Sequence, residues 1–240
     1  MSWFATWFDS PYYHLLYKNR DEKEAQVFID NLIEKLQLKK GSKLIDIACG
    51  KGRHATYFNK KGMNVVGVDL SPNSIASAKQ NENNNLQFSV HDMREVYKEN
   101  HFDIVTNLFT SFGYFENKDD EQKAINAMAE NLKSDGVLII DFMNIKKIIA
   151  NLISSEKKTI DGITFNIKRS VQNNHIIKDI EIIDDNETQH FQEKVKAITL
   201  ADFSAFVSNV GLNIIDIFGN YKLDDFDATI SDRLILICKK

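Results

Sequence analysis

The chain has 240 residues, of which 43% are hydrophobic, enough for one α/β domain with an elaboration or for a domain with a small subdomain. Its formal net charge of −4 and its interspersed lysines give no electrostatic footprint for nucleic acid, which argues against DNA as a partner. No stretch reaches the roughly 18 apolar residues of a membrane span, and residues 1–4 lack the basic start of a secretion signal, so we expect a cytoplasmic protein without a membrane partner.

Aromatic residues are dense in the first twenty positions. Two interpretations are open: the rings pack this segment onto the core, or they form a lid over a ligand site. Residues 21–38 then read as an amphipathic helix, and Gly41 suits its C-terminal stop. The N-terminal rings are Trp3, Phe4, Trp7, Phe8, Tyr12, Tyr13 and Tyr17.

A buried strand, a glycine turn and the start of a helix follow one another over residues 43–60. The strand, residues 44–48, is mostly apolar, as expected of a strand that is covered on both faces. Gly50 and Gly52 let the backbone turn tightly and approach a ligand, and the free N–H groups of the next helix point into the same gap. The pattern predicts a cradle for a small ligand.

Two cofactor classes use such a turn. Residues 50–55 satisfy the dinucleotide fingerprint G-x-G-x-x-G/A, and Asp69 lies about twenty residues further on, where a ribose-binding acid belongs. Asp46, however, ends the strand just before the turn, where its carboxylate would repel a pyrophosphate. The same carboxylate suits a ligand that carries positive charge. An NAD-dependent oxidoreductase and a non-enzymatic nucleotide-binding module remain as alternatives.

The pattern Asp-x-Ala-Cys-Gly-x-Gly-Arg at residues 46–53 resembles motif I of the class I S-adenosylmethionine-dependent methyltransferases. The ammonium and sulfonium groups of that cofactor are the positive charges that Asp46 would favour. Cys49 and Cys238 are too few for a disulfide framework, and we expect them to pack as small apolar thiols. The resemblance implies cofactor contacts from Asp46, Ala48, Gly50 and Gly52 in the turn, and from Tyr13, Tyr17 or Arg20 in the N-terminal segment.

The next two predicted strands, residues 64–70 and 86–90, both end in polar residues. Asp69 can accept two hydrogen bonds from a ribose diol, and Leu70 follows it at the cofactor. The resemblance implies that Asp92 accepts from the adenine amino group and that Met93 lies against the ring. For Asp92, a pairing with Arg94 or a cap on a short turn is the alternative.

The fourth predicted strand, residues 102–108, delivers polar and aromatic residues to the carboxyl edge of the sheet, where open parallel sheets bind ligands. Its continuation Phe-Thr-Ser-Phe-Gly-Tyr is similar to the small-molecule branch of the family and differs from the Asn/Asp-Pro-Pro-Tyr/Phe signature of enzymes that act on amide or nucleobase nitrogens. We take Asn107, Phe112 and Tyr114 as candidate catalytic residues, with Asn107 also near the cofactor. A loop that only packs is the alternative.

The rest of the chain completes the sheet and adds a second one. Asp141 and Asn144 end the fifth strand, residues 137–142, where they could meet a substrate. Alternating apolar residues between 162 and 200 predict three antiparallel strands. The last two strands are joined by a linker too short for a crossover helix, so they should pair antiparallel. The remaining predicted elements are helices at 119–132, 145–154 and 202–209 and strands at 212–218 and 234–238.

We therefore predict a Rossmann-like, seven-stranded, mostly parallel sheet with an antiparallel last strand, plus a three-stranded antiparallel insertion. A single methyltransferase domain would span residues 1–240, with residues 1–20 as an aromatic lid and residues 160–200 covering the site. The domain would be a monomer or a homodimer without a metal site.

The predicted reaction is methyl transfer from S-adenosyl-L-methionine to an N or O nucleophile of a small molecule by in-line displacement. Such a transfer needs alignment and exclusion of water more than an essential base, although His54, Tyr114 and Asp141 are available as bases. Transfer to tRNA or protein is the main alternative.

Overall fold

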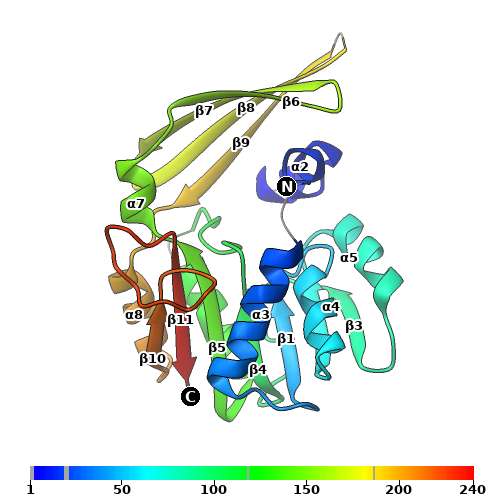
Figure 1. Cartoon of the computed structure of the whole chain (residues 1–240), viewed down its shortest axis with the longest axis vertical. Coiled ribbons are helices and arrows are strands. Elements are labelled where there is room, and N and C mark those ends of the chain that lie inside the picture. Colours follow the sequence, from blue (N-terminus) through cyan, green and yellow to red (C-terminus); the bar gives the residue numbers. More distant parts are fainter. Residues whose placement is uncertain (1–2, 19–21, 118, 186) are drawn as a thin grey trace.

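The computed structural model describes residues 3–18, 22–117, 119–185 and 187–240. Figure 1 shows a large sheet flanked by helices and a second sheet beyond the carboxyl ends of its parallel strands. The large sheet has seven strands in the order β10-β11-β5-β4-β1-β2-β3. They are β1 (Lys43–Ile47), β2 (Asn64–Asp69), β3 (Leu86–Val90), β4 (Phe102–Asn107), β5 (Leu132–Met143), β10 (Asn213–Phe218) and β11 (Arg233–Lys239).

Strand direction in this sheet confirms the predicted topology. β1 to β5 are parallel to one another, whereas β11 is antiparallel to β5 and β10 is antiparallel to β11. β1 lies between β2 and β4, so the chain builds outward on one side of β1 and then on the other. The carboxyl ends of the strands at such a reversal are where open α/β sheets bind ligands.

Helices cover both faces of the sheet, which explains the nearly continuous apolar runs of its strands. On one face, Phe28, Phe58 and Ile75 pack in a cluster with residues of β1 and β2. On the other face, Met128 and Phe203 belong to a second cluster. The helices are α3 (Glu22–Leu36), α4 (Arg53–Lys60) and α5 (Pro72–Ala78), followed by the short turn η1 (Lys79–Asn81), on the first face, and α6 (Asp120–Asn131) and α8 (Leu200–Ser208) on the second.

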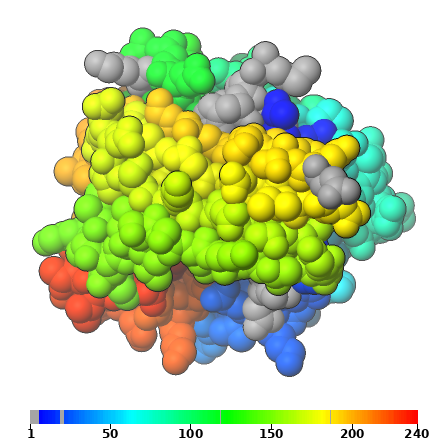
Figure 2. Space-filling model, turned by 90° about the horizontal axis from the view of Figure 1, so that it is seen from above, coloured from blue at the N-terminus to red at the C-terminus, as the bar shows by residue number. Residues whose placement is uncertain are grey.

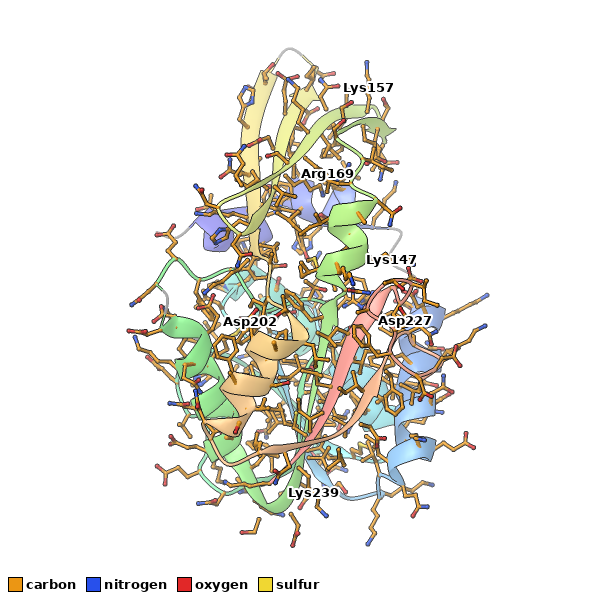
Figure 3. All side chains as sticks on the ribbon, turned by 90° about the vertical axis from the view of Figure 1, so that its left-hand side faces the viewer. Lys147, Lys157, Arg169, Asp202, Asp227 and Lys239 are labelled. Carbon is orange, nitrogen blue, oxygen red and sulfur yellow. The ribbon has the colours of Figure 1, made fainter. Side chains whose placement is uncertain are left out.

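The second sheet has four antiparallel strands rather than the predicted three. The missed strand, β6, reads Ser-Glu-Lys-Lys-Thr-Ile and is mostly exposed, so it lacks the alternation on which the prediction relied. Charged residues such as Lys157, which Figure 3 shows at the outer end of the molecule, suit an edge strand because they discourage pairing with other chains. The strands are β6 (Ser155–Ile160), β7 (Ile163–Gln172), β8 (His175–Asp184) and β9 (Glu187–Lys196).

The connections to this sheet also differ slightly from the prediction. The helix predicted at 145–154 is α7 (Ile145–Ala150) and ends four residues earlier, because β6 begins at Ser155. The β7–β8 hairpin turns at Asn173 and Asn174, both with positive φ, a conformation that two-residue hairpin turns require and that Asn tolerates. Among the described residues, no helix is long and apolar enough to cross a membrane.

Two short N-terminal helices, α1 (Trp3–Phe8) and α2 (Pro11–Leu16), pack against the second sheet. Trp7 is buried beside Phe165 and Ile180, and its ring centroid lies 4.8 Å from that of Phe191. In Figure 1, α2 lies between the second sheet and the helices of the large sheet. Figure 2, seen from above, shows the second sheet spread across this end of the molecule.

Candidate active site

The turn between β1 and α4 is built around two glycines with different surroundings. Ala48, Gly50 and Gly52 all have positive φ, at 58°, 57° and 79°. A Cβ on Gly52 would lie 2.5 Å from Cε1 of Phe88, whereas a Cβ on Gly50 would meet nothing within 4 Å. Gly52 is therefore required for packing, and Gly50 leaves open space beside the backbone.

That open space belongs to a cavity of about 500 Å³ at the carboxyl edge of the large sheet. Its walls come from the β1–α4 turn, the ends of β2 and β3, the loop after β4, and the N-terminal helices. Predicted site residues that line it are Tyr13, Tyr17, Ala48, Gly50, His54, Asp69, Leu70, Asp92, Met93 and Tyr114. Those not on its wall are Asp46, Gly52, Asn107 and Phe112, and Arg20 lies outside the described residues.

The carboxylate of Asp69 is fixed at the cavity by the backbone. Its Oδ2 accepts from the N–H of Gly50 at 2.8 Å, and its Oδ1 accepts from the N–H of Ser71 at 2.8 Å. Burial raises the pKa of Asp69, and these two N–H groups oppose that rise. Each oxygen keeps a second lone pair for a ligand donor, so the turn presents an oriented acceptor.

Asp46 lies behind the turn and does not face the cavity, contrary to the prediction. It is 1% exposed; Oδ1 accepts from Oγ1 of Thr106 at 2.8 Å, and Oδ2 has no partner at hydrogen-bond distance in the part of the chain that the structure describes. Burial raises the pKa of Asp46 to about 7, although Thr106, the N–H of Ala55 and the charge of Arg53 oppose the rise. The pleat of β1 turns this side chain inward, so a direct contact with a charged ligand is not supported.

Asp92 lies on the cavity wall and is paired with Arg94. Nη2 of Arg94 donates to Oδ2 of Asp92 at 2.5 Å, and Nη1 donates to Asp120 at 2.7 Å. The hydrogen bond from Arg94 lowers the pKa of Asp92. The pairing that sequence left as an alternative is therefore present, and it holds the carboxylate ionised next to Met93 in the same wall.

The loop after β4 separates the three predicted catalytic residues. Asn107 is buried and donates from Nδ2 to the carbonyl of Ile47 at 3.1 Å. Phe112 is buried in the core, with its ring centroid 5.6 Å from that of Phe203. Only Tyr114 lines the cavity, and its hydroxyl donates to the carbonyl of Thr110 at 2.7 Å.

Asp141 and Asn144, at the end of β5, do not reach the cavity either. Asp141 is 1% exposed and accepts from Arg233, Tyr221 and the N–H of Phe109. Asn144 donates from Nδ2 to backbone carbonyls of the segment before β11. Both side chains therefore hold loops together, and neither is placed to meet a substrate.

Sequence reasoning missed Glu193, which lines the cavity from β9. It accepts from Nε1 of Trp7 at 2.8 Å and from the hydroxyl of Tyr17 at 2.7 Å, and Nζ of Lys178 lies 3.4 Å from its Oε2. The Lys178 ammonium also donates to the Tyr17 hydroxyl. No local motif marks Glu193, because its position depends on how the second sheet meets the N-terminal helices.

Comparison with known proteins points to one class of enzyme. Residues 44–136 match the family described as "Methyltransferase domain". A protein of Geobacillus sp. (strain WCH70) that is named "Putative methyltransferase GWCH70_2453" is 24% identical to this chain. The match covers 99% of this chain and 98% of that protein. A solved S-adenosylmethionine-dependent methyltransferase from Clostridium acetobutylicum ATCC 824 has the same fold, with a TM-score of 0.79, 21% identity and 95% of each chain covered.

A further relative carries a substrate in its name. The dTDP-3-amino-3,4,6-trideoxy-alpha-D-glucopyranose N,N-dimethyltransferase of Streptomyces venezuelae is 27% identical over 132 residues. The match covers 54% of this chain, and the chain spans about half the length of that relative.

Proposed function

We propose that this chain is a class I S-adenosylmethionine-dependent methyltransferase that methylates an amine nitrogen of a small molecule. The observation that carries the proposal is a cavity lined both by the polar turn after β1 and by aromatic rings of the N-terminal segment and the loop after β4. The named relative acts on an amino sugar, which supports an amine acceptor of small size.

The turn end of the cavity fits the cofactor. Gly50 leaves open space for a ligand, and Asp69 presents an acceptor that suits the ribose hydroxyls. Asp92 and Met93 lie in the wall where the adenine would bind, and the backbone of Ala48 and Gly50 would adjoin the methionine part. When bound, S-adenosylmethionine supplies an electrophilic methyl group on a sulfonium.

Four aromatic side chains that touch one another, Phe8, Tyr13, Tyr17 and Tyr114, also line the cavity. The ring centroids of Phe8 and Tyr114 lie 5.1 Å apart, those of Phe8 and Tyr13 lie 4.9 Å apart, and those of Tyr13 and Tyr17 lie 5.0 Å apart. Aromatic faces attract alkylated ammonium groups, and the carboxylate of Glu193 lies in the same wall. The rings thus suit an acceptor that gains methyl groups at nitrogen, and they exclude water from it.

Radiolabelled methyl donor tests the proposal. The protein is incubated with the donor and with three separate fractions: a metabolite extract, bulk tRNA and cell protein. We expect label in the metabolite fraction, and we expect prior acylation of its amines to abolish that label. Asp69→Ala serves as the low-activity control, at a donor concentration near the Kd of the parent, because it removes the proposed cofactor acceptor.

Two results would contradict the proposal. Label confined to tRNA or protein would overturn the small-molecule acceptor. If metabolites are still labelled after their amines have been acylated, the acceptor is not an amine, and an oxygen nucleophile is indicated instead.

A further inference from the structure

Two consecutive residues of the cavity wall have a backbone conformation that side chains disfavour. Phe109 and Thr110 both have positive φ, at 63° and 60°, and both line the cavity. In this region the Cβ crowds the following carbonyl, and a β-branched residue such as Thr110 is among the least suited to it. Such strain persists only where the surroundings enforce it, and it concentrates at functional sites.

One buried ion pair supplies the restraint on both residues. The Asp141 carboxylate accepts from the N–H of Phe109 at 2.8 Å, and the Asp141 carbonyl accepts from the N–H of Thr110 at 2.9 Å. Arg233 donates from Nε to Asp141 at 2.7 Å and from Nη2 to Oγ1 of Thr110 at 2.9 Å. Tyr221 adds a hydrogen bond to the Asp141 carboxylate at 3.0 Å.

Stability of the fold alone does not explain why Asp141 and Arg233 form a buried ion pair. Asp141 is 1% exposed, and the Arg233 side chain is 18% exposed, so both charges have lost most of their hydration. Buried pairs often repay no more than that loss, and a hydrophobic pair of similar volume often serves a fold equally well. Within the part of the chain that the structure describes, the other side-chain hydrogen bonds of the pair go to the cavity loop or to Tyr221, so its contacts point to a role in shaping that loop.

We propose that Asp141 and Arg233 are positioning residues that hold Phe109 and Thr110 in the conformation that lines the cavity beside Tyr114 and the other aromatic rings. Neither lines the cavity, so they act through the loop. The Thr110 carbonyl accepts from the Tyr114 hydroxyl, so the loop conformation also sets the place of that ring. The inference rests on the proposed function in one respect only, that the methyl acceptor binds beside the Tyr114 ring.

The first measurement needs no acceptor. Hydrogen exchange is followed in peptides that cover residues 105–115 in Asp141→Asn and in Arg233→Lys, which keeps the charge but loses the bond to Thr110. We expect exchange at least tenfold faster in this loop in both variants, with the affinity for S-adenosylhomocysteine within about threefold of the parent. Asp232→Asn is the matched control, because Asp232 directly precedes Arg233 and is also part of an ion pair. Its partner is Lys147 on α7, at 2.5 Å (Figure 3).

The decisive step is rescue by glycine. Glycine adopts positive φ without a steric penalty, so Thr110→Gly should slow hydrogen exchange of the loop again in the Asp141→Asn variant. A role of Asp141 in stability alone predicts no such recovery. With the labelled acceptor fraction, Asp141→Asn should raise KM at least tenfold and change kcat less, and Thr110→Gly should recover part of that loss.

Three results overturn the proposal: unchanged loop exchange, exchange that rises equally throughout β4 and β5, or no rescue by glycine. A failure to label any amine is different. It removes the amine acceptor and leaves the loop measurement as an independent test of Asp141 and Arg233.

Discussion

The two glycines of the β1–α4 turn should respond differently to a methyl group. In Gly52→Ala the new Cβ would clash with Phe88 at positive φ, so we expect a loss of about 2–4 kcal/mol in the free energy of unfolding. In Gly50→Ala only the conformational cost applies, about 1–2 kcal/mol, but the methyl group should weaken cofactor binding. Urea unfolding and calorimetry with S-adenosylhomocysteine measure the two effects. Equal destabilisation by both substitutions would contradict this assignment.

Asp46 gives the protein a pH dependence of known sign. Its pKa is about 7 in the folded state against 3.8 for the unperturbed group, so the folded state holds the proton more tightly. The stability that protonated Asp46 contributes to the folded state is present below pH 4. It is lost as the pH rises to about 7, because the unfolded chain then binds fewer protons than the folded one. Asp46→Asn should therefore gain stability relative to the parent between pH 4 and pH 8, by at most about 4 kcal/mol.

Denaturant unfolding of both proteins across that range checks the prediction. Other titrating groups cancel in the difference between the two proteins, provided that both fold alike. A difference that stays constant with pH would show that Asp46 is ionised throughout.

Asp69 should matter to the cofactor more than to the fold. Loss of its charged acceptor in Asp69→Ala should cost about 1.5–3 kcal/mol of binding, or roughly 10- to 150-fold in Kd for S-adenosylhomocysteine. Asp103→Ala is the matched control, since Asp103 also accepts a backbone N–H, from Lys43 at 2.8 Å, at the opposite end of the strands. Calorimetry that finds the same Kd in both variants would make Asp69 a structural residue.

At the scale of single residues, sequence predicts a site better than it predicts the direction of a side chain. Asp69, Asp92 and Met93 lie in one cavity because the carboxyl ends of adjacent parallel strands meet there. Asn107 and Phe112 sit in the same segment as Tyr114, yet they point into the core. Pleat and register decide that choice, and both depend on neighbours that the segment itself does not encode.

The elements of the large sheet were predictable because each carries its own periodicity and stop signals. The alternation at residues 163–167 likewise predicted β7, whose Phe165 and Ile167 are buried. β6 was missed because an exposed, charged edge strand has no apolar face to reveal it. Its strand form comes from pairing with β7, a tertiary effect that overrides the local pattern.

Trp7 is the most buried side chain that the structure describes in the N-terminal helices. Trp7 is 1% exposed against the second sheet and donates to Glu193, so Trp7→Ala should release this segment while the large sheet stays folded. Local opening of that kind exposes backbone to proteases, and we expect trypsin to cleave after the exposed Lys18 at least tenfold faster. Tyr12→Phe is the control, since it keeps the ring and removes only the hydrogen bonds of the hydroxyl with Asp184 and Gln189. If the cleavage rate is unchanged, the contact with the sheet does not hold the segment.

Over the whole molecule, the cavity joins parts that are far apart in sequence. Its wall includes residues of the N-terminal helices, the β1–α4 turn and β9. Occupancy should therefore stabilise all of them at once: S-adenosylhomocysteine at one hundred times its Kd should add about 2.7 kcal/mol to the free energy of unfolding. Thermal unfolding and hydrogen exchange measure this, with NAD as the comparison ligand. An equal shift with NAD would indicate binding without selectivity for the methyl-donor cofactor.

The position of β11 has a consequence for how the protein is made. It is the last strand in chain order, yet it is an internal one, bonded to β5 on one side and β10 on the other. While the ribosome is still short of Arg233, β5 has a bare edge and Asp141 has no guanidinium beside it. A nascent chain therefore carries an open, apolar strand edge that is prone to pair wrongly, and its cavity loop lacks one of its two restraints. Synthesis of β11 thus covers the edge of β5 and brings Arg233 to Asp141 in the same step.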